Sequence, residues 1–130
     1  MSAFVVPFKN EPGQLATLCE AMAAHGVNLI LCGIGHGESG TVALVADDEA
    51  GARTVLESSS LEFTERDALT VRLANVPGAG AEIFGRLRDA NVNVELVLPI
   101  RVSSDEFFAV ICADNLDGAR SALGDQVVAA

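Results

Sequence analysis

Hydrophobic and polar positions alternate at the start of the chain and then change to a helical spacing. Residues 4–8 place phenylalanine and valine at every second position, which is typical of a strand with one face on a core. Leu15, Leu18, Cys19 and Met22 follow at i, i+3, i+4 and i+7, which predicts a helix that opens at Pro12 and stops before Gly26. The same reasoning predicts the next elements, which are strands at 27–34 and 41–46, a helix at 48–58 and a strand at 61–65.

The chain then repeats itself at an offset of about 65 residues. Asn10, Pro12 and Gly13 fall on Asn75, Pro77 and Gly78, and 51–57 matches 118–124 with Gly-Ala-Arg identical. A repeat of this kind indicates two copies of one supersecondary unit. In the second copy the pattern predicts strand 68–73, helix 77–90, strands 93–102 and 107–113, a helix from about 116, and a short or frayed last strand within 125–130.

Two helices for every four strands, in βαββαβ order, predict an α+β fold. We expect two ferredoxin-like units, 1–66 and 67–130, each an antiparallel four-stranded sheet with two helices on one face. Pro7 lies in a strand that this fold places centrally, so we expect a bulge or an early strand end there, because proline has no N–H to donate. Asn91 stands where the first unit has Gly26, and we expect it in the left-handed region.

Composition and charge narrow the classes of partner. Half of the residues are apolar, and eight basic side chains face eighteen acidic ones, a net charge of −10. Nucleic acids and anionic membranes both require a cationic surface, so neither is expected as a partner. The chain shows no signal-peptide pattern and no apolar run of about 20 residues, and its three cysteines lie in apolar segments. We therefore expect reduced core thiols and a cytoplasmic protein.

The repeated Asn-x-Pro-Gly phrase is the strongest candidate for a binding site. It lies at the predicted strand-to-helix turn of each unit, and Asn28 and Asn93 follow eighteen residues after the first Asn. Free N–H groups at a helix start attract a carboxylate, a glycine lets a ligand approach the main chain, and asparagine amides can hold an amino group. We expect the intervening strand and helix to bring the second Asn back toward the turn. The alternative is that the phrase only shapes a turn.

The remaining patterns give no catalytic or metal site. The glycine-rich segment 33–40 lies between two strands rather than before a helix, which does not fit a dinucleotide loop. Neither histidine has a partner at metal-ligand spacing, so no metal and no cofactor are expected. No nucleophile or paired-carboxylate arrangement has supporting context, which favours a protein that is not an enzyme.

Taken together, the N-x-P-G phrase, the amphipathic helix and the following Gly-Val-Asn resemble the ACT domain family of small-molecule regulatory modules. The resemblance covers both units and implies a tandem pair without an attached enzyme. It implies an amino-acid site built from the turn after the first strand and the start of the second strand, commonly at an interface between two ACT units. In this sequence it implicates Asn10, Glu11, Pro12, Gly13 and Asn28, and in the second unit Asn75, Val76, Pro77, Gly78 and Asn93.

The expected function is therefore a non-enzymatic regulatory sensor for a small amino acid or a related carboxylate. The alternative is a regulatory subunit that docks on an amino-acid biosynthetic enzyme, and a third interpretation is a small ferredoxin-like enzyme working in the same cleft. High apolar content and a shortened last strand leave surface to cover, which predicts a homodimer.

Overall fold

A computed structural model describes residues 1–128, and the βαββαβ order occurs in it twice. The first copy contains β1 (Ser2–Lys9), α1 (Gln14–Ala24), β2 (Leu29–His36), β3 (Ser39–Ala46), α2 (Glu49–Ser58) and β4 (Thr64–Asp67). The second contains β5 (Leu69–Ala74), α3 (Ala79–Asp89), β6 (Val94–Ile100), β7 (Glu106–Ala113), α4 (Leu116–Leu123), the short 3-10 helix η1 (Gly124–Gln126) and β8 (Val127–Val128).

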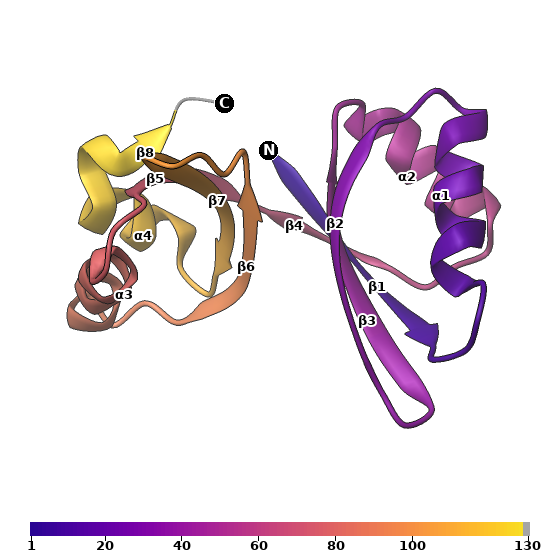
Figure 1. Ribbon diagram of the computed structural model, residues 1–130, viewed down its shortest axis with the longest axis horizontal. Helices are drawn as coiled ribbons and strands as arrows, with labels where there is room; N and C mark the ends of the chain where they lie inside the picture. Colours follow the sequence, from indigo (N-terminus) through magenta and orange to yellow (C-terminus); the bar gives the residue numbers. More distant parts are fainter. Residues whose placement is uncertain (129–130) are drawn as a thin grey trace. The chain divides into compact units, whose positions relative to one another are not determined.

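Each copy forms one four-stranded antiparallel sheet with its two helices on one face (Figure 1). The strand orders are β2-β3-β1-β4 and β6-β7-β5-β8, so the α+β prediction is confirmed. The chain divides into two compact units, Ser2–Arg66 and Met1 with the residues from Asp67 onward. We call them the N-terminal unit and the C-terminal unit. In the former, β1 and β2 both pair antiparallel with β3, and they therefore run parallel to each other.

Each unit has its own aliphatic core between the sheet and the helices. The residues that were predicted to face the core form it. Alternate residues of each strand point to the side of the sheet on which the buried residues of α1 lie. The N-terminal core consists of Phe4, Val6, Leu18, Met22, Val27, Val42, Leu44, Ala52, Val55 and Leu56. The C-terminal core consists of Leu69, Val71, Leu73, Ile83, Leu87, Val92, Ala109, Ile111, Ala113, Ala119 and Leu123.

Two local predictions are wrong and one is confirmed. Pro7 neither ends nor bulges β1, because the register with β3 is unbroken and Pro7 lies opposite Thr41. A strand tolerates proline at a position whose N–H would point away from the paired strand. Cys32 is exposed on β2, so it is not a core thiol. Asn91 has a φ of 57°, as expected from Gly26, whose φ is 67°.

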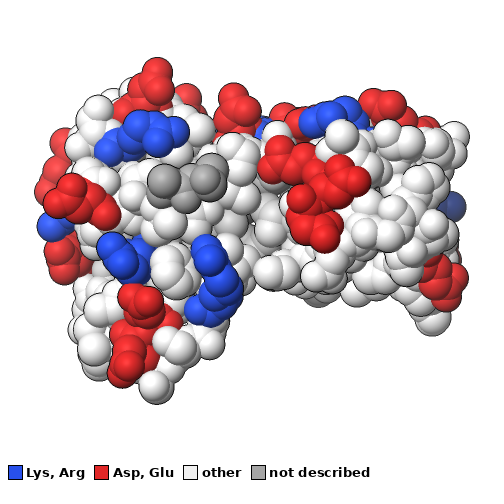
Figure 2. All heavy atoms as spheres, turned by 90° about the horizontal axis from the view of Figure 1, so that it is seen from above, with Lys and Arg blue, Asp and Glu red and all other residues white. Residues whose placement is uncertain are grey.

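The surface carries acidic groups in several clusters, whereas basic side chains lie in separate spots on the face drawn in Figure 2. Among residues 1–128, no helix has the length and apolarity needed to cross a membrane. One ion pair has favourable geometry: Arg53 donates from Nε and Nη2 to the two carboxylate oxygens of Glu65, both at 2.7 Å. The Ser2 hydroxyl donates to Glu65 as well, also at 2.7 Å.

These contacts make the stability of the N-terminal unit pH-dependent. Hydrogen bonds from Arg53, and then from Ser2, lower the pKa of Glu65 from its ordinary 4.5 to about 2. Below pH 4.5 the Glu65 carboxylate binds a proton in the unfolded chain, whereas in the folded chain it stays ionised until the pH nears 2. This stabilisation is therefore lost as the pH falls from about 4.5 to about 2. Thermal melts of Glu65→Gln should therefore differ from wild type at neutral pH and converge on it at the acidic end. Glu62→Gln, which breaks no ion pair, is the control; a constant difference at all pH values would contradict the assignment.

Candidate ligand-binding site

The repeated phrase forms a left-handed turn in front of the first helix of each unit. Gly13 has φ 89° and ψ −8°, and Gly78 has φ 91° and ψ −11°. Proline followed by a left-handed glycine is typical of a type II turn, and the Ala79 N–H donates to the Val76 carbonyl at 3.3 Å, as that turn requires. The helices consequently begin one residue after each glycine, two residues later than predicted from the prolines.

The two helices that follow these turns lack side-chain caps, whereas the other two helices have them. The Asp48 carboxylate accepts from the Gly51 N–H at the start of α2, and the Asn115 amide oxygen accepts from the Gly118 N–H at the start of α4, both at 2.9 Å. Gly13 and Gly78 have no side chain to offer. The first N–H groups of α1 and α3 therefore have no side-chain acceptor at the helix cap.

Asn10 and Asn75 fix these turns to the neighbouring hairpins. Nδ2 of Asn10 donates to the Gly37 carbonyl at 3.0 Å, and Nδ2 of Asn75 donates to the Ser103 carbonyl at 2.7 Å. The Asn10 amide also lies against β2 where that strand has no side chain, since a Cβ on Gly35 would be 2.7 Å from Oδ1 of Asn10. In both units the first Asn of the phrase thus has a structural role that the sequence did not predict.

The second Asn of each unit lies at the wrong end of the sheet for the predicted site. Asn28 precedes β2, and its N–H donates to the Asp47 carboxylate at 2.9 Å. Asn10 lies beside the other end of β2, next to the β2–β3 turn. Asn93 is placed like Asn28, with its N–H on the Asp114 carboxylate at 2.9 Å. The prediction that Asn28 and Asn93 return to the turn of their own unit is wrong, because β2 runs parallel to β1 and begins at the far edge of the sheet.

The remaining predicted residues are exposed around the turns. Glu11, Pro12, Val76 and Pro77 all lie at the surface, and Val76 is 58% exposed. Glu11 borders two hollows, one beside Asn10 and the hairpin turn, and one open groove toward the chain after α2. We call the second hollow the head-group groove; it is lined by Pro7, Phe8, Lys9, Glu11, Gln14, Ser60, Leu61 and Glu62.

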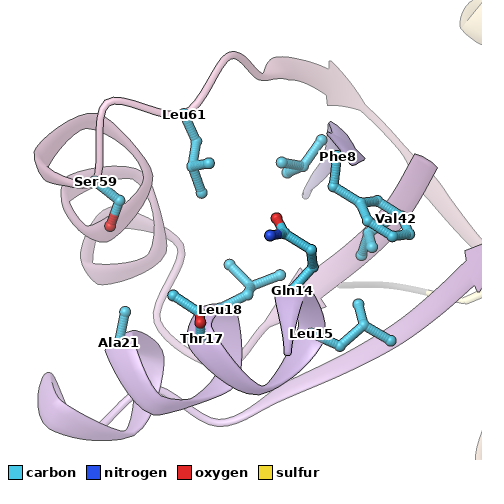
Figure 3. A pocket seen from close by; sticks show the side chains of 10 residues that line it. Phe8, Gln14, Leu15, Thr17, Leu18, Ala21, Val42, Ser59 and Leu61 are labelled. Atoms are coloured by element: carbon cyan, nitrogen blue, oxygen red, sulfur yellow. The ribbon is translucent and has the colours of Figure 1, made fainter. Parts of the chain in front are cut away.

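A cavity of about 110 Å³ lies beside this groove, between α1 and the sheet of the N-terminal unit. In Figure 3 the Gln14 side chain points into the space between Phe8, Leu61 and Leu18. The lining is mostly apolar and is made of Val6, Phe8, Gln14, Leu15, Thr17, Leu18, Ala21, Val42, Ser59 and Leu61. None of the residues predicted for the site lines this cavity. Comparing the repeats would have given one indication, because Ala21 and Ser59 are smaller than their counterparts Arg86 and Gln126.

Comparison with solved structures gives matches across nearly the whole chain. Protein BT0572 from Bacteroides thetaiotaomicron matches with a TM-score of 0.86 and 22% identity, covering 98% of this chain and 90% of that one. The ligand-free regulatory subunit of aspartate kinase from Thermus thermophilus gives 0.70 and 18%, covering 96% and 90%. The corresponding subunit from Thermus flavus gives 0.65 and 22%, covering 94% and 88%. The fold is of the ACT type.

The predicted resemblance is thus confirmed at the level of the fold. At sequence identities of 18–22%, the similarity to these structures establishes the ACT-type architecture but does not identify a ligand. No protein-family model and no curated protein sequence matches the chain. Within residues 1–128, no three histidine, cysteine or acidic side chains are grouped as metal ligands would be. Among the described residues, the features that could take part in binding are the two turns, the uncapped helix starts, the head-group groove and the apolar cavity.

Proposed function

We propose that the protein is a non-enzymatic regulatory sensor that binds a small amino acid or a related carboxylate. The observation that carries the proposal is the start of α1, where no side chain caps the first N–H groups of the helix. Gly13 leaves open space in front of them, since a Cβ there would meet no atom within 4 Å. Such donors favour a carboxylate. The ACT-type fold, shared with regulatory subunits of aspartate kinase, supports the regulatory part of the proposal.

The proposal keeps the turn residues of both units as candidate ligand contacts. Asn10, Glu11, Pro12 and Gly13 surround the start of α1, and Asn75, Val76, Pro77 and Gly78 surround the start of α3. Asn28 and Asn93 would meet the ligand from a second copy of the chain, since they lie away from the turn of their own unit. Binding would bias how the copies associate, and this is how occupancy becomes a signal to an enzyme partner.

A thermal-shift screen against the twenty amino acids tests the function. A ligand at a hundred times its dissociation constant stabilises the folded state by about 2.7 kcal/mol. In a chain of this size that raises the melting temperature by several degrees. We expect at least one amino acid to produce such a shift. A melting temperature that no amino acid or small carboxylate moves by as much as about one degree would count against the sensor function.

We also propose that the protein is a homodimer. The strand β2 lies at the edge of its sheet, and Ile34 on it is 75% exposed. An exposed apolar edge strand pairs readily with another chain. Light scattering at micromolar concentration should give about twice the chain mass of 13.5 kDa. The monomer mass at that concentration would show that the edge does not serve this purpose.

The same exposed edge favours the second candidate, a subunit that docks on an amino-acid biosynthetic enzyme. Ile30 and Ile34 project from β2 with 43% and 75% of their surface exposed, which suits a protein partner as well as a second copy. Co-purification of a metabolic enzyme that is lost in Ile34→Lys, together with no amino-acid shift in the thermal screen, would favour docking over sensing.

A further inference from the structure

The cavity beneath α1 distinguishes the two units. At the repeat offset of 65, Ala21 corresponds to Arg86, and at the offset of 67 set by the paired caps Asp48 and Asn115, Ser59 corresponds to Gln126. In the C-terminal unit Nη1 of Arg86 donates to Oε1 of Gln126 at 2.7 Å. This contact bridges the place that small residues leave open in the N-terminal unit.

The size of the cavity selects the ligand group that fits it. An apolar cavity of roughly 150 Å³ accommodates a benzene ring. A cavity of about 110 Å³ is suited to a smaller group, an aliphatic branch of about four carbons. Gln14, Thr17 and Ser59 are the polar side chains of the lining. Val6, Leu18 and Val42 are buried and offer no hydrogen bond, so a polar group placed against these three residues would lose its water without replacement.

The head-group groove supplies charges of both signs at the mouth of this cavity. The two spaces adjoin, since Phe8, Gln14 and Leu61 line both of them. Lys9 is the only lysine of the chain, and it forms no ion pair with the described residues. Glu11 and Glu62 line the same groove. An ammonium and two carboxylates around an apolar cavity are complementary to a zwitterion with an aliphatic tail.

We propose that, of the two units, only the N-terminal unit binds the amino acid, and that this amino acid has a branched aliphatic side chain. Its side chain enters the cavity beneath α1, its α-carboxylate lies toward Lys9 and the start of α1, and its α-ammonium lies toward Glu11 and Glu62. This inference rests on the proposed amino-acid sensing and adds the class of side chain, the unit that binds it and the selecting residues.

Calorimetric titration of the full chain with L-leucine, L-valine, L-threonine and L-aspartate tests the inference. We expect one site per chain and at least tenfold tighter binding of L-leucine than of L-aspartate. The double variant Ala21→Arg with Ser59→Gln copies the bridge of the C-terminal unit into the cavity and should weaken L-leucine binding at least tenfold. Its matched control, Arg86→Ala with Gln126→Ser, should bind as wild type within twofold. Lys9→Met should weaken binding about tenfold without affecting the fold.

The outcomes separate this inference from the general function. Tight binding of L-aspartate or L-threonine without L-leucine binding, or full L-leucine affinity in the Ala21→Arg, Ser59→Gln variant, would overturn the cavity site and leave amino-acid sensing intact. Failure of all four amino acids here and of the other sixteen in the thermal screen would overturn both. If circular dichroism shows that the double variant is unfolded, Ala21→Leu replaces it, and unchanged affinity in a folded Ala21→Leu would equally overturn the site.

Discussion

Replacing Gly40 with alanine should lower the free energy of unfolding by about 1–3 kcal/mol, because the added methyl group has no room. Gly40 pairs with Phe8 across β1 and β3, and a Cβ on it would lie 2.5 Å from Cζ of Phe8. The same Cβ would lie 2.8 Å from the Ile34 carbonyl oxygen, which belongs to the backbone of β2 and cannot turn aside. We expect the measured cost, from urea unfolding, near the upper end of the range.

The C-terminal unit shows how the neighbouring side chain can change to accommodate a larger residue. There Leu73 lies opposite Phe107 at the position equivalent to Phe8 opposite Gly40. Gly40→Ala should therefore cost less in a Phe8→Leu background, by at least about 0.5 kcal/mol, a coupling typical of residues in contact. Gly85→Ala in α3 is the control, since its Cβ would have ordinary contacts and helical alanine gains about 0.5–1 kcal/mol over glycine. Equal costs in both backgrounds would contradict the Phe8–Gly40 contact.

The fold could be predicted from the sequence because the same pattern of strands and helices occurs twice in the chain. The matching of Gly51 with Gly118 and of Asn10 with Asn75 fixed the repeat, and hydrophobic periodicity then identified each strand and helix. The errors are local: α1 begins after Gly13 because that glycine is left-handed, and no periodicity reveals the sign of a φ angle. Likewise the tolerance of Pro7 depends on which side of β1 its nitrogen faces, and only the register settles that.

The candidate site was less accessible to sequence reasoning. The spacing from Asn10 to Asn28 counts one strand and one helix, but it does not say that β2 lies beyond β3 with its start at the far edge. The cavity is a still harder case, because two of its lining residues, Ala21 and Ser59, differ from their counterparts only in being small. A cavity has no sequence motif of its own. This cavity is recognised by comparing the two units, because Arg86 and Gln126 occupy the corresponding place in the C-terminal unit.

Replacing Gly13 with valine should lower the free energy of unfolding by about 1–3 kcal/mol, even though the new Cβ meets no neighbouring atom. The φ of Gly13 is 89°, in the left-handed region, and a Cβ there would have no atom within 4 Å, so the cost comes from backbone strain rather than from a clash at Cβ. Gly78→Val, at φ 91°, should behave in the same way. Valine consequently confounds the two interpretations of the repeated phrase, since it disturbs the turn whether or not a ligand binds there.

Asparagine at position 13 distinguishes a ligand-binding role of the phrase from a purely structural one, because asparagine tolerates the left-handed region. Asn91 of this chain already adopts that region, with a φ of 57°. Gly13→Asn should cost less than about 1 kcal/mol of stability, a small fraction of the strain expected from valine. If the glycine lets a carboxylate reach the N–H groups of α1, the asparagine side chain obstructs that approach, and amino-acid affinity should fall at least tenfold in titration calorimetry. Gly78→Asn should bind as wild type within about twofold, because Arg86 and Gln126 bridge the place in the C-terminal unit that corresponds to the cavity. Wild-type affinity in a folded Gly13→Asn variant would mean that the phrase shapes a turn and does no more.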